Sequence, residues 1–125
     1  MTGVVLDAGA LVQFERNNRP VVALVARALH HGDPLVVPAG VVAQVWRDGR
    51  RQARLARLLG SPACQVAALD DRRARAAGQL CGLSRTKDVV DASVVVVAQE
   101  RALPVLTSDA GDLRRLDPRL AIVPV

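Results

Sequence analysis

The chain has 125 residues, 50% hydrophobic and 23% charged, a balance that excludes intrinsic disorder and predicts one domain over residues 1–125 with a single core. Its net charge of +5 favours a polyanionic partner, because the long-range field attracts phosphate groups. The two cysteines, Cys64 and Cys81, have no His at zinc-ligand spacing around them and indicate neither a zinc site nor a disulfide framework. No apolar run approaches the ~20 residues of a membrane span, so a cytoplasmic protein with no membrane association is expected.

Short Val-rich runs alternate along the chain with segments of helical periodicity. The runs that predict short buried strands are residues 4–6, 35–37, 66–69, 105–106 and 121–123. The segments with helical spacing are residues 20–31, 41–59, 71–83 and 88–102. Because strands and helices alternate, the sequence predicts an α/β fold with a parallel sheet covered by helices on both faces.

Two aspartates stand where predicted strands end. Asp7 directly follows the first run, and Asp109 follows the fourth, two residues after Thr107. Ligands of open α/β sheets bind outside the carboxyl ends of the strands, where the strand order reverses. If the first and fourth strands are neighbours there, these two carboxylates face each other.

Three further aspartates are placed to join this pair. Asp91 lies one turn into the helix predicted over 88–102 and interrupts an otherwise apolar stretch, while Asp88 shares its helix face and Asp112 follows Asp109 by three residues. Crowded carboxylates repel each other unless a divalent cation neutralises them, and oxygen ligands suit Mg²⁺ or Mn²⁺. Asp7, Asp88 and Asp109 could each instead cap a helix, so the metal interpretation depends on the joint placement of the aspartates.

These motifs resemble those of PIN domains, and more narrowly those of VapC-type toxin ribonucleases. The resemblance spans nearly the whole chain and depends on residues 4–11, 91–98 and 105–113. It implies a three-layer α/β/α sandwich whose parallel sheet has the order 3-2-1-4-5, with strands one and four adjacent. It also implies Mg²⁺- or Mn²⁺-dependent cleavage of single-stranded RNA, a homodimer, and a cognate antitoxin that inserts into the active-site groove.

The resemblance carries metal-ligand positions over to Asp7, Asp91 and Asp109, with Asp112 assisting and Asp88 as a lesser candidate. The family usually has a Glu in the helix after the second strand, and the aligned residue here is Gln44. A neutral amide can offer a carbonyl oxygen or hold a water, but it adds no charge to cation binding. A catalytically weakened module that binds RNA or a protein partner is therefore the alternative to an active nuclease.

Arginines recur at three- and four-residue intervals along the helix predicted over 41–59: Arg47, Arg50, Arg51, Arg54 and Arg57. One side of this helix is therefore expected to be basic, beginning beside Gln44, and to bind RNA phosphates or acidic groups of an antitoxin. A solvated face without a ligand is the alternative. Phe14 and Trp46 are the only aromatic residues, too few for a base-stacking platform, so contacts to the RNA backbone should dominate.

An aspartate after a first strand also begins phosphotransfer domains, which are a further alternative. Asp7 is followed by Ala8 and Gly9, so the second aspartate of a phosphatase Asp-x-Asp motif is missing. No lysine follows a late strand, as receiver domains require, since the single lysine is Lys87. Both departures disfavour an aspartate-based phosphotransfer reaction.

Overall fold

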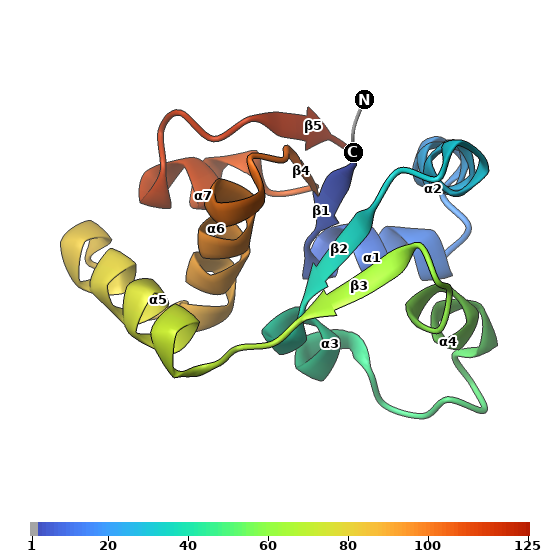
Figure 1. Cartoon of the computed structure of the whole chain (residues 1–125), viewed down its shortest axis with the longest axis horizontal. Helices are drawn as coiled ribbons and strands as arrows, with labels where there is room; N and C mark the ends of the chain where they lie inside the picture. Colours follow the sequence, from blue (N-terminus) through green and yellow to red (C-terminus); the bar gives the residue numbers. More distant parts are fainter. Residues whose placement is uncertain (1–2) are drawn as a thin grey trace.

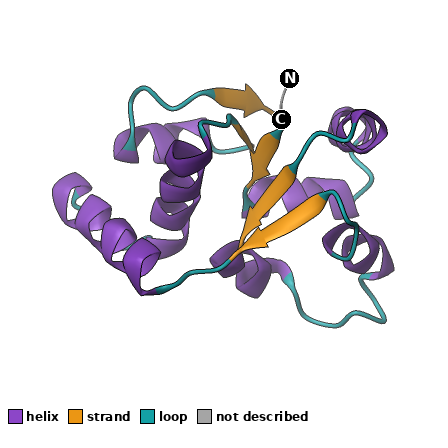
Figure 2. Cartoon of the chain, viewed as in Figure 1, coloured by secondary structure: helices purple, strands orange, loops and turns teal. Residues whose placement is uncertain are grey.

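The computed structural model describes residues 3–125, so residues 1 and 2 of the expected 1–125 domain lie outside the described residues. Its five strands form one parallel sheet in the order β3-β2-β1-β4-β5 (Figure 2), which confirms the sequence prediction. The strands are β1 (Val4–Leu6), β2 (Leu35–Pro38), β3 (Cys64–Ala67), β4 (Val105–Thr107) and β5 (Ile122–Pro124). The order places β1 beside β4.

Helices cover both faces of this sheet. They are α1 (Ala8–Glu15), α2 (Arg19–His31), α3 (Ala39–Val45), α4 (Ala53–Leu59), α5 (Asp71–Ser84), α6 (Val89–Arg101) and α7 (Ala110–Leu116). In Figure 1, α1, α2 and α4 gather on one side and α5, α6 and α7 on the other, while α3 lies at the carboxyl ends of β1 and β2 and contacts both α1 and α6. The result is the expected α/β/α sandwich. Within residues 3–125, every helix is too short or too polar to span a bilayer.

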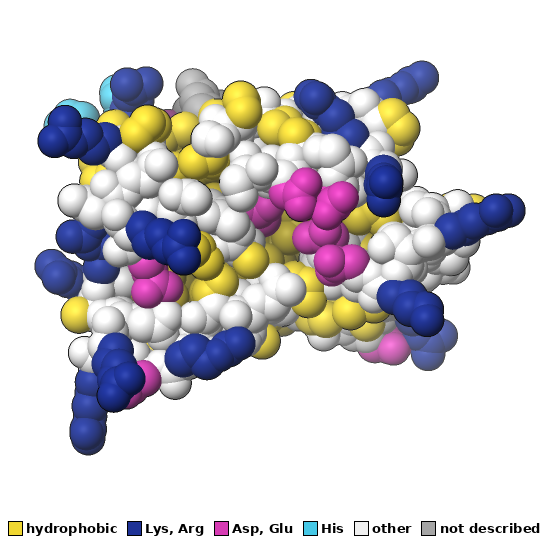
Figure 3. Space-filling view, turned by 180° about the vertical axis from the view of Figure 1, so that it is seen from behind, with side chains coloured by type: hydrophobic (Ala, Val, Ile, Leu, Met, Phe, Trp, Pro, Cys, Tyr) yellow, Lys and Arg dark blue, Asp and Glu magenta, His cyan; other side chains and the backbone are white. Residues whose placement is uncertain are grey.

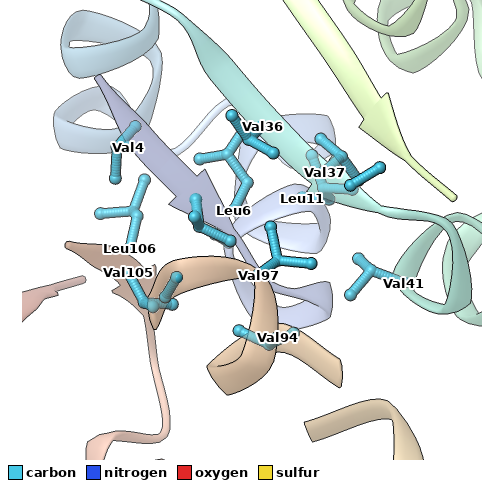
Figure 4. Close-up of a cluster of buried hydrophobic side chains, with 14 of the residues drawn as sticks. Val4, Leu6, Leu11, Val36, Val37, Val41, Val94, Val97, Val105 and Leu106 are labelled. Carbon is cyan, nitrogen blue, oxygen red and sulfur yellow. The ribbon is translucent and has the colours of Figure 1, made fainter. Parts of the chain in front are cut away.

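Helix α6 is the most deeply buried helix and carries Asp91 in its first turn. Its residues from Ala92 to Ala98 are all buried, so the helix is apolar around nearly its whole circumference. Figure 4 shows Val94 and Val97 among side chains of the sheet such as Leu6. Each fully buried valine contributes roughly 1.5–2 kcal/mol of transfer free energy, so the core holds α6 and its first turn firmly against β1 and β4.

The prediction of a single helix over 41–59 is wrong, because the chain leaves helical geometry at Trp46 and returns to it at Ala53. The side chain of Gln52 stabilises the intervening loop. Its Oε1 accepts hydrogen bonds from the backbone N–H groups of Arg47 at 2.7 Å and Asp48 at 3.0 Å, and its Nε2 donates to the carbonyl of Val45 at 2.8 Å. These bonds replace the main-chain bonds that a continuous helix would have made.

Two smaller differences concern an edge strand and two short helices. The third strand lies at Cys64–Ala67 rather than at 66–69, and Val66 and Leu69 are 49% and 44% exposed. Because β3 is an edge strand, apolar side chains there do not mark the buried positions. Helices α1 and α7 have eight and seven residues, too few for a clear helical period, and the sequence did not predict them.

Candidate metal centre

Asp7 is buried at the end of β1 and is held in a fixed orientation. One carboxylate oxygen accepts the backbone N–H of Ala10 at 2.9 Å, which caps α1, and the other accepts the hydroxyl of Thr107. The register that pairs Leu6 with Leu106 brings Asp7 and Thr107 side by side. Burial raises the pKa of Asp7, and the charge of Asp109 adds to this effect, whereas the hydrogen bonds from Thr107 and Ala10 oppose it.

Thr107 connects two of the predicted ligands, and sequence reasoning missed this role. Its hydroxyl oxygen accepts the backbone N–H of Asp109 at 2.8 Å while its hydroxyl proton goes to Asp7. The one available signal was a hydroxyl residue at the end of an otherwise apolar strand. The contact sets the position of Asp109 relative to Asp7.

Asp88 and Asp91 form a second pair at the start of α6. Asp88 caps the helix by accepting the backbone N–H of Asp91 at 2.9 Å, as the sequence pattern predicted. Asp91 is half-buried, and its pKa is raised to about 7. Burial is the largest cause, followed by the charge of Asp88, a hydrogen bond with the Asp88 side chain, and the charges of Asp7 and Asp112.

Asp109 and Asp112 form a third pair at the start of α7. Asp109 occupies the cap position, but its carboxylate makes no capping hydrogen bond, and both side chains are exposed. Their carboxyl groups lie within hydrogen-bonding range of each other, which raises the pKa of Asp112, together with the charge of Asp109. Neither carboxylate is committed to holding the local backbone.

These five residues, Asp7, Asp88, Asp91, Asp109 and Asp112, are here called the aspartate cluster. Charge interactions connect Asp91 with Asp7, Asp88 and Asp112, and connect Asp109 with Asp7 and Asp112, so the structure brings all five near one another. Figure 3 shows one larger patch of acidic side chains near the middle of a face of the molecule, while smaller acidic groups and most basic side chains lie toward the outline. A cavity of about 120 Å³ opens beside the cluster, lined by Thr86, Asp88, Asp91, Asp112, Arg115 and Leu116.

The donor chemistry of the cluster fits a hard divalent cation. All its donors are carboxylate oxygens, and none of the ion pairs within residues 3–125 involves a member of the cluster. The same part of the chain contains no three His, Cys, Asp or Glu side chains that already form a metal-ligand set. Coordination therefore requires rotation of side chains, and Asp109 and Asp112 are exposed and free of capping bonds.

Gln44 lies on α3, one helical turn after Gly40. A Cβ added to Gly40 would lie 3.5 Å from Cγ2 of Val90, so this face of α3 packs against the first turn of α6. The Gln44 side chain is exposed and does not line the cavity beside the cluster. The structure brings the helix of Gln44 to the site without placing its amide among the carboxylates.

The expected basic helix face is absent because α3 and α4 are separate helices. Arg47, Arg50 and Arg51 lie in the intervening loop, where Arg47 donates to the carbonyls of Ala43 at 3.1 Å and Trp46 at 2.7 Å. Of the two arginines on α4, Arg54 donates to Asn17 at 2.6 Å and Arg57 belongs to the last turn. These side chains do not form a single stripe. Arg115, which sequence reasoning missed, is the basic side chain that lines the cavity.

Comparisons with known proteins agree with this architecture. A family model described as PIN domain matches residues 4–118. Among solved structures, FitAcB from Neisseria gonorrhoeae is 19% identical (TM-score 0.69; 95% of each chain covered) and a toxin–antitoxin complex from Klebsiella pneumoniae is 16% identical (TM-score 0.69; 96% of this chain and 95% of that one). VapBC2 from Rickettsia felis, bound to a promoter DNA fragment, is 11% identical (TM-score 0.74; 98% of each chain). No curated protein matches the sequence.

Proposed function

The chain belongs to the PIN domain family, and on this premise we propose that it is a metal-dependent endoribonuclease that cuts single-stranded RNA as the toxin of a toxin–antitoxin pair. PIN domains are generally nucleases and usually use divalent metals. One observation carries the proposal. Five aspartates from separate segments meet at the carboxyl ends of β1 and β4 without any ion-pair partner within residues 3–125.

Asp7, Asp91 and Asp109 are the proposed metal ligands, with Asp112 and Asp88 as additional oxygen donors. A bound Mg²⁺ or Mn²⁺ supplies Lewis acidity and neutralises negative charge at the phosphodiester. Asp7 presents its oxygens in a fixed direction because Thr107 and Ala10 hold the carboxylate. The raised pKa of Asp91 leaves its carboxyl group partly protonated at neutral pH, so Asp91 would have to release a proton to bind the cation.

A second candidate function is a non-catalytic module that binds RNA or a protein. The observation that favours it is Gln44, which is neutral and exposed where the family usually supplies a charged Glu. Fewer negative charges weaken cation binding. The two functions differ in one measurable property, because the module binds RNA and leaves it intact.

The proposed partners follow from the proposed role. The fold likeness to a protein solved as a toxin–antitoxin complex supports a cognate antitoxin as partner, and we include a homodimer as the assembly. The exposed arginines Arg47, Arg50, Arg51 and Arg54 remain proposed contacts to RNA phosphates, although they act from a loop and a separate helix. A site of action in the cytoplasm and a single domain over residues 1–125 belong to the same proposal.

The test is RNA cleavage by the purified protein in Mg²⁺, in Mn²⁺ and in chelator. We expect cutting in either metal, none in chelator and none for Asp7→Asn, which keeps an oxygen to accept the Ala10 N–H. Asp71→Asn is the matched control, because Asp71 is exposed on α5, away from the cluster, and its ion-pair partner among residues 3–125 is Arg75. Cutting that survives Asp7→Asn would contradict the site, and phosphate transfer to Asp7 would support the phosphotransfer alternative.

A further inference from the structure

Arg115 stands in the wall of the cavity beside the aspartate cluster. It lies on α7, three residues after Asp112, and lines the cavity together with Thr86, Asp88 and Asp91. Asp112 also lines this cavity, so the guanidinium shares it with three carboxylates of the cluster.

Within residues 3–125 this guanidinium nevertheless forms no ion pair. The ion pairs within residues 3–125 join Arg51 to Asp48, Arg72 and Arg73 to Glu100, and Arg75 to Asp71. None of the side-chain hydrogen bonds in the same part of the chain involves Arg115 either. Its five N–H donors are thus available to a ligand in the cavity.

A cation so placed works against metal binding, because two positive charges repel each other. An anionic ligand in the cavity would offset this repulsion. A cluster of five carboxylates around one divalent ion keeps a net negative charge and repels a phosphodiester, and Arg115 is the basic side chain that lines the cavity. A guanidinium also matches the geometry of two phosphate oxygens.

We propose that Arg115 is a substrate-positioning residue that binds a non-bridging phosphate oxygen of the RNA strand beside the aspartate cluster. This inference deepens the proposed nuclease function and depends on it. Thr86, whose hydroxyl oxygen accepts the backbone N–H of Asp88 at 3.2 Å, lines the same cavity. Because Arg115 recognises the backbone, its contribution is independent of base sequence.

The test compares Arg115→Ala and Arg115→Lys with Arg114→Ala, a neighbouring exposed arginine of α7 that does not line the cavity. Mn²⁺ binding is measured alone by calorimetry, and binding of an uncleavable 2′-O-methyl oligoribonucleotide is measured in Mn²⁺ over a range of salt. For Arg115→Ala we expect oligonucleotide binding to be about 10-fold weaker. The slope of the logarithm of the binding constant against the logarithm of the salt concentration should be smaller in magnitude by about 0.7. We expect Mn²⁺ binding to be as tight as in wild type or tighter. Lysine should restore part of the affinity, and Arg114→Ala should match wild type.

Three results would overturn the proposal, and they are distinguishable. If wild type cuts RNA while Arg115→Ala binds the oligonucleotide as tightly as Arg114→Ala does, Arg115 has no positioning role and the nuclease proposal stands. If Arg115→Ala weakens Mn²⁺ and oligonucleotide binding together and lowers the Tm, its role is structural. If wild type neither binds Mn²⁺ nor cuts RNA, the proposed function itself fails.

Discussion

Metal binding by this protein should depend steeply on pH between 6 and 8, because Asp91 must be deprotonated to act as a ligand. Its pKa is raised to about 7 by burial and by the neighbouring carboxylates. With that pKa, about nine-tenths of the Asp91 side chains carry a proton at pH 6 and about one-tenth at pH 8. Since the cation competes with this proton, the apparent affinity for Mn²⁺ should rise about tenfold over these two pH units.

Calorimetry in buffers of different ionisation enthalpy measures both the affinity and the protons released. We expect release of about 0.9 proton per Mn²⁺ at pH 6, about 0.5 at pH 7 and about 0.1 at pH 8. Asp91→Asn should weaken binding and remove most of the pH dependence, whereas Asp71→Asn should behave as wild type. An affinity that stays constant from pH 6 to 8, or a pH dependence that persists in Asp91→Asn, would refute the reasoning.

Three other predictions concern the stability of the protein and Gln44, which stands where the family usually has a Glu. The metal-free protein should lose thermal stability as pH rises from about 4 to about 7, because Asp91 ionises near its ordinary pKa of 3.8 in the unfolded chain but keeps its proton until about pH 7 in the folded protein. Saturating Mn²⁺ should reverse this loss of stability. A Tm that rises between pH 4 and pH 7 would contradict the prediction. Gln44→Glu should tighten Mn²⁺ binding in calorimetry, because it adds a negative charge on the helix that packs against the first turn of α6; an unchanged affinity would show that position 44 does not act on the site. Gln52→Ala should lower the free energy of unfolding by about 1–3 kcal/mol in urea titration, because it leaves backbone groups of the loop without partners; a change near zero would show that water replaces those bonds.

The sequence predicts the alternation of strands and helices and the candidate site residues because both depend on local patterns. A Val-rich helix interrupted by Asp91 and two aspartates directly after strand ends are readable without coordinates. Family resemblance then supplies the order that makes β1 and β4 neighbours. The structure confirms that order, and it brings the five predicted aspartates into electrostatic contact.

The features that the sequence did not reveal depend on side-chain geometry. The helix break after Val45 follows from the amide of Gln52, which bonds the loop backbone, and no proline marks it. Thr107 contacts Asp7 across 100 positions of the chain, and Arg115 reaches the cavity from a helix too short to show a period. Such contacts need the paired register of β1 and β4 before they can be seen.

The most direct test of the metal centre is a crystal structure of the protein soaked in Mn²⁺, read from the anomalous signal of the ion. We expect one strong peak with carboxylate oxygens of Asp7, Asp91 and Asp109 at about 2 Å from the ion. No peak at this position under saturating Mn²⁺, or a peak bound by other residues, would contradict it.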